Sequence, residues 1–284
     1  MQLKEKILRI ALPNKGRLAE PSVKLLKDAG FCFENGENRL SAKCSDFPLE
    51  ILFVRAEDIP AYVGDGTADL GITGLDLVRE KRFACPPLLE LGFGKCRLAL
   101  AAPKNSPEGL EWLDGKRVAT SFPVLAEEFL LETGVNAKIV PLKGSVELAP
   151  RLGVADAIVD LVSSGNTLES NGLEERAPLL ESQAVLIGPK ELGEVEESVV
   201  LSIKSVLAGR GRKLVVANIP ESSLDVLKDV PALAGPTIAA IYGKTGMLSV
   251  QTVVSSGKIS STVQLLKKAG ATGILVTPIE RLVE

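Results

Sequence analysis

The sequence of 284 residues contains no histidine. This absence excludes a Ser-His-Asp triad, an imidazole general base and any metal site with imidazole ligands. A reaction carried out by this chain must therefore depend on the positioning of its substrates, on charged side chains and on a hard cation such as Mg²⁺.

Aromatic residues are scarce, and charge of neither sign dominates. Phe, Trp and Tyr make up 4% of the chain, which leaves few side chains on which nucleic-acid bases could stack. Lys and Arg number 33 against 36 Asp and Glu, a net charge of −3, so no excess of positive charge attracts a phosphate backbone. The composition therefore argues against a nucleic-acid partner.

Long apolar runs are missing too: none approaches the roughly 18–20 residues that span a bilayer. The first residues also lack the pattern of a secretory signal. The four cysteines include no Cys-x-x-Cys pair, and they are Cys32, Cys44, Cys85 and Cys96. We therefore expect a cytoplasmic protein with no membrane partner, whose cysteines are free thiols.

Predicted strands and helices alternate over most of the chain, which is typical of an α/β fold. We expect two lobes, one made of residues 1–95 with 183–205 and the other of residues 96–182. Predicted strands at 183–187 and 198–203 would return the chain to the first lobe, so that two crossings make a hinged pair with a cleft. Three of the helices have predicted N-cap residues, Asp58, Ser121 and Ser145.

Residues 206–284 have a different pattern. Strands are predicted at 214–219, 237–241, 249–254 and 273–277, and helices at 220–227 and 259–269. The resulting βαββαβ order is that of a ferredoxin-like domain. The chain therefore ends in a third domain.

The most informative segment is 156–168. An apolar strand carries Asp160 to its carboxyl end, and a loop of small polar residues follows: Ser163, Ser164, Gly165, Asn166 and Thr167. The N–H groups and hydroxyls of such a loop can bind a phosphate, while the carboxylate beside them binds the hydroxyls of a sugar. The segment thus suits a sugar phosphate, and the alternative is an ordinary turn between a strand and a helix.

Asp156 lies four residues before Asp160, on the same face of the predicted strand. Because only Asp160 is next to the loop, Asp160 is the better ligand for a sugar. Asp156 is either a second substrate ligand or a structural carboxylate at the start of the strand.

Basic residues follow two other predicted strands. Asn14-Lys15-Gly16-Arg17 comes after the first strand, at the edge where open α/β sheets bind ligands, and two cations beside a glycine suit a di- or triphosphate. Arg55 follows a later strand and could add a phosphate contact. The alternative is a solvated loop for Lys15 and Arg17, and a surface ion pair with a carboxylate for Arg55.

Residues 69–74 form a short segment rich in glycine. Gly71 and Gly74 would let an adenine or a phosphate approach the backbone closely. A tight buried turn explains the same glycines equally well.

Taken in order, these segments resemble the long form of ATP phosphoribosyltransferase, the first enzyme of histidine biosynthesis. The resemblance extends over the whole chain, is most specific at 155–168, and is also carried by residues 9–18, 58–60, 68–74, 144–147 and 270–278. It implies transfer of the phosphoribosyl group of phosphoribosyl diphosphate (PRPP) to N1 of the adenine of ATP, with Mg²⁺ as cofactor and release of diphosphate.

The resemblance also implies the architecture and the assembly. The catalytic part would have two lobes like those of periplasmic binding proteins, with the active site in the cleft. The C-terminal ferredoxin-like (ACT-like) domain would bind histidine as a feedback inhibitor. Members of the family act as homodimers and form homohexamers.

Roles are carried over by position in this sequence, and no Mg²⁺ ligand is assigned. Lys15, Arg17 and Asp160 would be catalytic. The substrate-binding residues would be Arg55, Asp69, Leu70, Gly71, Glu147, Asp156, Ser163, Ser164, Gly165, Asn166, Thr167 and Leu168. The histidine-binding residues would be Asn218, Thr237 and Ala271.

Three rival functions remain open. A solute-binding protein has the same two lobes, but it has no use for the third domain or the loop after Asp160. A regulatory or inactive homologue is disfavoured because Lys15, Arg17 and that loop are all present. Another phosphoribosyltransferase could use a different acceptor base, which glycine-rich segments do not reveal.

Overall fold

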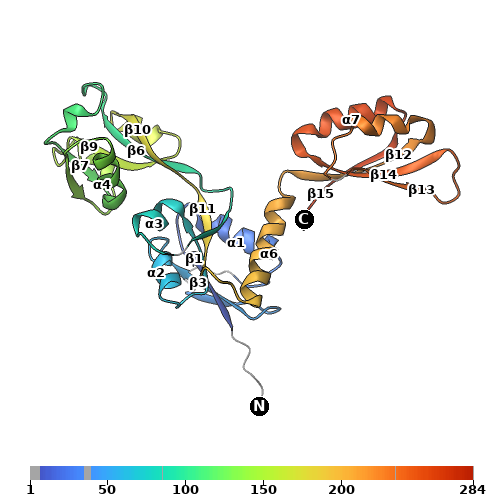
Figure 1. The fold of residues 1–284 in the computed structure, drawn as a ribbon, viewed down its shortest axis with the longest axis horizontal. Helices are drawn as coiled ribbons and strands as arrows, with labels where there is room; N and C mark the ends of the chain where they lie inside the picture. Colours follow the sequence, from blue (N-terminus) through green and yellow to red (C-terminus); the bar gives the residue numbers. More distant parts are fainter. Residues whose placement is uncertain (1–6, 35–39, 85, 234, 284) are drawn as a thin grey trace, which may run out of the picture. The chain divides into compact units, whose positions relative to one another are not determined.

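The computed structural model describes residues 7–34, 40–84, 86–233 and 235–283. Two compact units make up the fold (Figure 1). The larger unit is formed by the chain up to residue 197 apart from 28–30, and the smaller by residues 28–30 with the chain from 198 onward.

Lobe I of the larger unit is built around a six-stranded sheet. Its elements are β1 (Leu8–Pro13), α1 (Ala19–Asp28), β2 (Ser41–Lys43), β3 (Leu49–Val54), α2 (Ile59–Gly64), β4 (Leu70–Gly74), α3 (Leu75–Glu80), β5 (Pro87–Glu90) and β11 (Ala184–Ile187). The strand order is β2-β3-β1-β4-β11-β5. β1 is parallel to β3 and β4, and it is buried almost throughout, as expected for a parallel strand covered on both faces.

Lobe II is built around a five-stranded sheet. Its elements are β6 (Cys96–Pro103), η1 (Glu111–Leu113), β7 (Arg117–Thr120), α4 (Pro123–Glu132), β8 (Lys138–Pro141), η2 (Val146–Leu148), β9 (Ala157–Val162), α5 (Asn166–Ser170) and β10 (Leu173–Ser182). The strand order is β10-β6-β9-β7-β8, with β7 parallel to β8 and β9. Alternate residues of β9 enter two cores, Ile158 and Val162 one of them and Ala157 and Val159 the other.

The chain crosses between the two lobes twice, after β5 and after β10. Leu91 N–H donates to the carbonyl of Ala184 (3.0 Å), and Ala184 N–H donates to the carbonyl of Phe93 (2.9 Å), which joins the crossing segments to each other. The predicted return of 183–187 to the first sheet is confirmed. Two α/β lobes with two crossings are the arrangement of periplasmic binding proteins.

The prediction of a strand at 198–203 is wrong. These residues belong to helix α6 (Glu194–Gly209). The apolar run resembles a strand, but Val199, Ile203 and Val206 are buried at the spacing of one helix face. Acidic residues in the first turn also favour a helix start there.

The smaller unit contains a four-stranded antiparallel sheet with the order β13-β14-β12-β15. This is the ferredoxin-like order, as predicted. The elements are β12 (Arg212–Pro220), η3 (Glu221–Asp229), β13 (Thr237–Ala240), β14 (Met247–Ser255), η4 (Ser256–Lys258), α7 (Ile259–Lys268) and β15 (Thr272–Pro278). The segment predicted as a first helix is 3-10 helix η3, whose two serines and two aspartates are weak α-helix formers.

The predicted caps are also corrected by the structure. Asp58 and Ser145 stand at the N-cap positions of α2 and η2, but neither makes a side-chain capping bond. The N-cap of α4 is Phe122, and the hydroxyl of Ser121 donates instead to the carbonyl of Leu142 (2.9 Å). Ser121 lies one residue too early because Pro123 occupies the first position of the helix.

Cys32, Cys44 and Cys96 are free thiols, as predicted, and Cys85 lies outside the described residues. Within the described ranges, every helix is too short or too polar to cross a membrane.

Candidate functional site

Three predicted cations meet at one edge of the lobe I sheet. Lys15 and Arg17 follow β1, and Arg55 follows β3, its parallel neighbour. Asn14 N–H donates to the carbonyl of Val54 (2.8 Å), so the two loops lie side by side. All three cations are exposed, and this carboxyl edge is where open α/β sheets bind their ligands. Nη1 of Arg55 lies 3.7 Å from Oε1 of Glu57, which is the surface ion pair that the alternative for Arg55 predicted.

Arg17 also contacts lobe II. Its guanidinium donates to Sγ of Cys96 (2.8 Å), the first residue of β6. Burial raises the pKa of the Cys96 thiol, and the Arg17 charge opposes that rise. Cys96 therefore stays a neutral thiol that holds the guanidinium at the crossing between the lobes.

The register of the lobe II sheet places the loop after β9 at the same crossing. Arg97, the neighbour of Cys96, is paired with Val162, and Ser163 follows directly. The residue that anchors Arg17 and the start of the predicted phosphate loop are thus on adjacent strands at one end of the sheet. The structure brings these two predicted elements together.

Asp160 lies on β9 and is mostly buried. Burial raises the pKa of its carboxyl group, the N–H of Leu161 opposes this by donating to Oδ1 (2.7 Å), and the charge of Glu147 adds to the rise. Glu147 comes from η2, which packs against the face of β9 that carries Asp160. Two carboxylates therefore stand close together beside the loop.

The loop itself turns at Gly165, whose φ of 84° suits glycine. Asn166 begins the short helix α5, so the segment is a turn between a strand and a helix, whatever its ligand. Leu168 is buried in the lobe II core and anchors this helix. Ser163, Ser164 and Thr167 stay exposed, available to a ligand.

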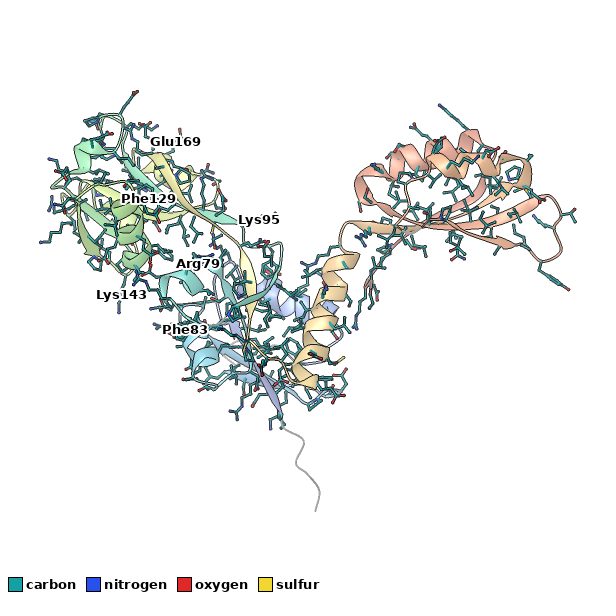
Figure 2. All side chains as sticks on the ribbon, in the orientation of Figure 1. Arg79, Phe83, Lys95, Phe129, Lys143 and Glu169 are labelled. Atoms are coloured by element: carbon teal, nitrogen blue, oxygen red, sulfur yellow. The ribbon has the colours of Figure 1, made fainter. Side chains whose placement is uncertain are left out.

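A cleft of about 750 Å³ lies between the lobes. Arg55 and Lys81 line it from lobe I, and Ser121 and Lys143 line it from lobe II. Lys143 is visible on lobe II in Figure 2. The three cations can bind phosphates, but Glu57, Asp58 and Glu80 line the same space and balance their charge.

Lys143 was not among the predicted site residues, although the sequence contains a pattern that indicates it. Lys143-Gly144 follows β8 after one residue, Leu142, as Lys15-Gly16 follows β1 after one residue, Asn14. In both pairs the glycine has a positive φ, 101° for Gly144 and 81° for Gly16. A lysine beside such a glycine at the carboxyl end of a strand is the shared pattern.

Other predicted residues lie elsewhere. Asp69 precedes β4, and its Oδ2 accepts the N–H of Arg9 (2.8 Å) near the amino end of β1. Leu70 is fully buried, and a Cβ on Gly71 would lie 2.5 Å from a methyl group of Ile59. The structure does not bring these three residues to the edge that carries Lys15, and their proposed role rests on their position in the family.

Asp156 also stands away from the loop. Its Oδ2 accepts the N–H of Arg117 (2.9 Å) and lies 3.6 Å from Nε of the same arginine. This contact is at the amino end of β9, opposite to the loop. The geometry favours the structural alternative for Asp156.

Two of the three predicted histidine-binding residues share one face of the smaller unit's sheet. Asn218 is paired with Ser249, and Thr237 with Gln251, so both alternate away from the core residues Ala217 and Val250. Ala271 belongs to the core itself, immediately before β15. The face that carries Asn218 and Thr237 is opposite to the one packed by α7 and η3.

Family models match nearly the whole chain beyond residue 54. The model for ATP phosphoribosyltransferase matches residues 55–209, and the model for the HisG C-terminal domain matches residues 209–281. The chain belongs to the ATP phosphoribosyltransferase family. The second match places it among the long forms of that family, which catalyse the first step of histidine biosynthesis.

Individual relatives agree with this placement. The ATP phosphoribosyltransferase of Methanopyrus kandleri is 44% identical over 98% of this chain and 100% of its own length. That of Methanosarcina barkeri is 41% identical over 97% of this chain and 99% of its own. A chain of the ATP phosphoribosyl transferase (HisG:HisZ) complex from Thermotoga maritima superposes with a TM-score of 0.60 and 31% identity, over 69% of this chain and 98% of that one.

Gly71→Ala should destabilise the fold by about 1–3 kcal/mol, because the added methyl group overpacks the contact with Ile59 and Val63. Urea unfolding without any ligand measures the loss. The matched control is Gly257→Ala, where no atom lies within 4 Å and where we expect a change within about 0.5 kcal/mol. Equal stability of the two variants would show that the packing around Gly71 is loose enough for a ligand.

Asp160→Asn should raise the melting temperature at pH 8. The pKa of Asp160 is raised on folding, so the folded state binds its proton more tightly than the unfolded chain does. The charged carboxylate therefore costs stability above its folded pKa, and this cost disappears as the pH falls below about 4, the ordinary range of aspartate. Calorimetry between pH 4 and 8 checks whether the gain shrinks toward acid; a gain independent of pH would contradict this cause.

Proposed function

We propose that this chain transfers the phosphoribosyl group of PRPP to N1 of ATP, releases diphosphate, and is inhibited by histidine. The observation that supports this proposal is the contact of Arg17 with Cys96, which with the β6–β9 register puts Arg17 near the start of the loop after Asp160. A sugar phosphate with a diphosphate leaving group needs these groups together. The site forms only when both lobes contribute.

The lobe II residues would hold the ribose 5-phosphate half of PRPP. The carboxylate of Asp160 accepts hydrogen bonds from the ribose hydroxyls, and burial strengthens such charge-assisted bonds. The N–H groups and hydroxyls of 163–167 take the 5′-phosphate. Glu147, beside Asp160, is a second candidate for the ribose side.

Cations of both lobes would bind the phosphate groups of the two substrates. Lys15 and Arg17 stabilise the departing diphosphate, while Arg55 and Lys143 bind phosphates of ATP in the cleft between the lobes. N1 of adenine is already a neutral nucleophile, so no strong base is needed and the missing histidine is no obstacle. Alignment of N1 with the anomeric carbon supplies the rest of the rate.

Mg²⁺ fits this site as an ion that enters with its substrates. Among the described residues, no group of three or more Cys, Asp or Glu could hold a metal, but Mg²⁺ commonly takes one or two carboxylates and completes its shell with substrate phosphates and water. Asp160 and Glu147 are the carboxylates within reach of the ribose. When bound, Mg²⁺ would neutralise charge on the diphosphate.

The C-terminal domain, residues 206–284, would be the regulatory part. Asn218 and Thr237 lie on a sheet face that none of the described helices of the domain packs against, so pairing of two copies could complete a histidine site there. This fits a homodimer that assembles into a homohexamer. With ATP and PRPP as substrates, the protein would work in the cytoplasm.

The intact protein should release diphosphate from PRPP only when Mg-ATP is also present, and added histidine should suppress the release. A coupled diphosphate assay with mass detection of phosphoribosyl-ATP measures both effects. Release without sensitivity to histidine would remove the regulatory proposal and keep the transfer. No release at millimolar substrates would leave a binding or regulatory protein on the same fold.

Asp160→Ala should lower kcat/KM for PRPP by about 100-fold or more, since it removes the half-buried carboxylate proposed to bind the reacting sugar. The control is Asp114→Ala, which removes an exposed carboxylate from the same lobe and should leave the rate nearly unchanged. Circular dichroism shows whether both variants fold. Equal rates for wild type and Asp160→Ala would remove Asp160 from the site.

A further inference from the structure

Helix α3 of lobe I is held by lobe II at both of its ends. At its start, the N–H of Asp76 donates to Oγ of Ser182 (3.1 Å), and that hydroxyl donates to Oδ1 of Asp76 (2.5 Å). Ser182 is the last residue of β10, and both side chains are buried. The N–H of Leu75 donates to the carbonyl of Gln183 (3.0 Å) in the crossing segment.

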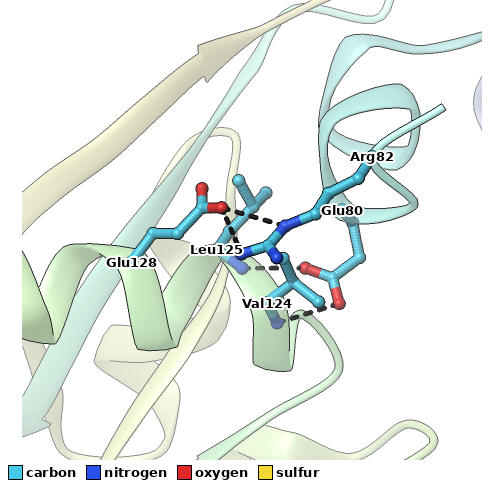
Figure 3. Close-up of polar contacts among 5 residues, drawn as sticks. All are labelled: Glu80, Arg82, Val124, Leu125 and Glu128. Carbon is cyan, nitrogen blue, oxygen red and sulfur yellow. Dashed lines mark hydrogen bonds and ion pairs between the residues drawn. The ribbon is translucent and has the colours of Figure 1, made fainter. Parts of the chain in front are cut away.

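At the other end of α3, Glu80 caps a helix of lobe II. Its Oε1 accepts the N–H of Val124 (3.1 Å) and its Oε2 accepts the N–H of Leu125 (3.0 Å), the second and third residues of α4 (Figure 3). These N–H groups have no partner within their own helix, and a negative charge beside them is favourable. Glu80 thus caps the N-terminus of α4, the role that was predicted for Ser121.

The burial of Glu80 makes this the strongest polar contact between the two helices. Glu80 is only 8% exposed, and charge-assisted bonds away from water are worth more than exposed ones. The neighbouring Arg82–Glu128 pair has side chains that are 65% and 47% exposed, so solvent screens most of its attraction. Leu77 adds an apolar contact with the lobe II core.

Both helices begin at the edges that carry the two half-sites. α3 follows β4 beside the loop of Arg55, where the hydroxyl of Thr73 donates to the carbonyl of Ala56 (2.7 Å). α4 follows β7 and Ser121 on the lobe II side, and Glu80 itself lines the cleft. A contact between these helices therefore fixes the width of the cleft.

We propose that Glu80 is a positioning residue for the transfer reaction, which it serves by holding the two half-sites at a fixed spacing. This inference rests on the proposed function. Each lobe would still bind its own part of the substrates without Glu80, but the reacting atoms would lose their alignment. A misplacement of about 1 Å can cost about 100-fold in rate, so kcat responds while KM hardly changes.

The test compares Glu80→Gln with Glu175→Gln in the full-length protein. Glutamine keeps the shape of Glu80 but turns an amide donor toward one of the two N–H groups. The control removes a carboxylate of the same kind, bound to Nε of Arg97 (2.8 Å), within lobe II alone. Glu80→Asp keeps the charge on a shorter side chain and should give an intermediate result.

Two readouts are needed, kinetics normalised to folded protein and amide hydrogen exchange at Val124 and Leu125. We expect Glu80→Gln to lower kcat by about 10- to 100-fold with KM for PRPP and ATP within about threefold. Exchange at the first turn of α4 should accelerate, and the control should change neither readout.

Three outcomes would overturn the proposal. They are a kcat equal to that of the control, a raised KM with unchanged kcat, and exchange at α4 equal to that of wild type. Inactive wild-type protein would instead count against the transfer reaction itself. In that case the exchange measurement still tests whether Glu80 joins the lobes.

Discussion

The candidate site depends on the hydrogen bonds that hold two separate sheets together at the crossing between the lobes. Asp76, Ser182 and Cys96 are buried there, and Arg17 reaches this cluster from the loop after β1. Buried polar groups are costly unless they are paired, so such a cluster favours one arrangement of the lobes. No single lobe contains the complete site.

The chemistry of the site follows from charge and placement. The chain has no histidine, and the proposed reaction needs none, because a neutral nucleophile attacks and a polyanion leaves. Cations stand at the carboxyl edge of lobe I, and the half-buried carboxylate of Asp160 stands beside a small polar loop on lobe II. Catalysis would therefore come from alignment and from electrostatic stabilisation of the leaving group.

Sequence patterns located the strands and loops well where a single element decides the answer. The loops after β1 and β9, the βαββαβ order and the return of β11 were all predicted. The error at α6 has a clear cause, since its apolar run fits a strand as well as one face of a helix. The assignment of Ser121 as a cap failed because a residue of the other lobe supplies the capping carboxylate.

The sequence by itself determined the fold class, the family and the residue types available for chemistry, because these follow from local patterns and from the order of motifs. Tertiary structure decided which of those residues meet. It placed Arg17 at the start of β6, turned Asp156 toward Arg117 and packed Gly71 against Ile59. It also brought Lys143 and Glu80 to the cleft, because contacts between lobes join residues that are far apart in the chain.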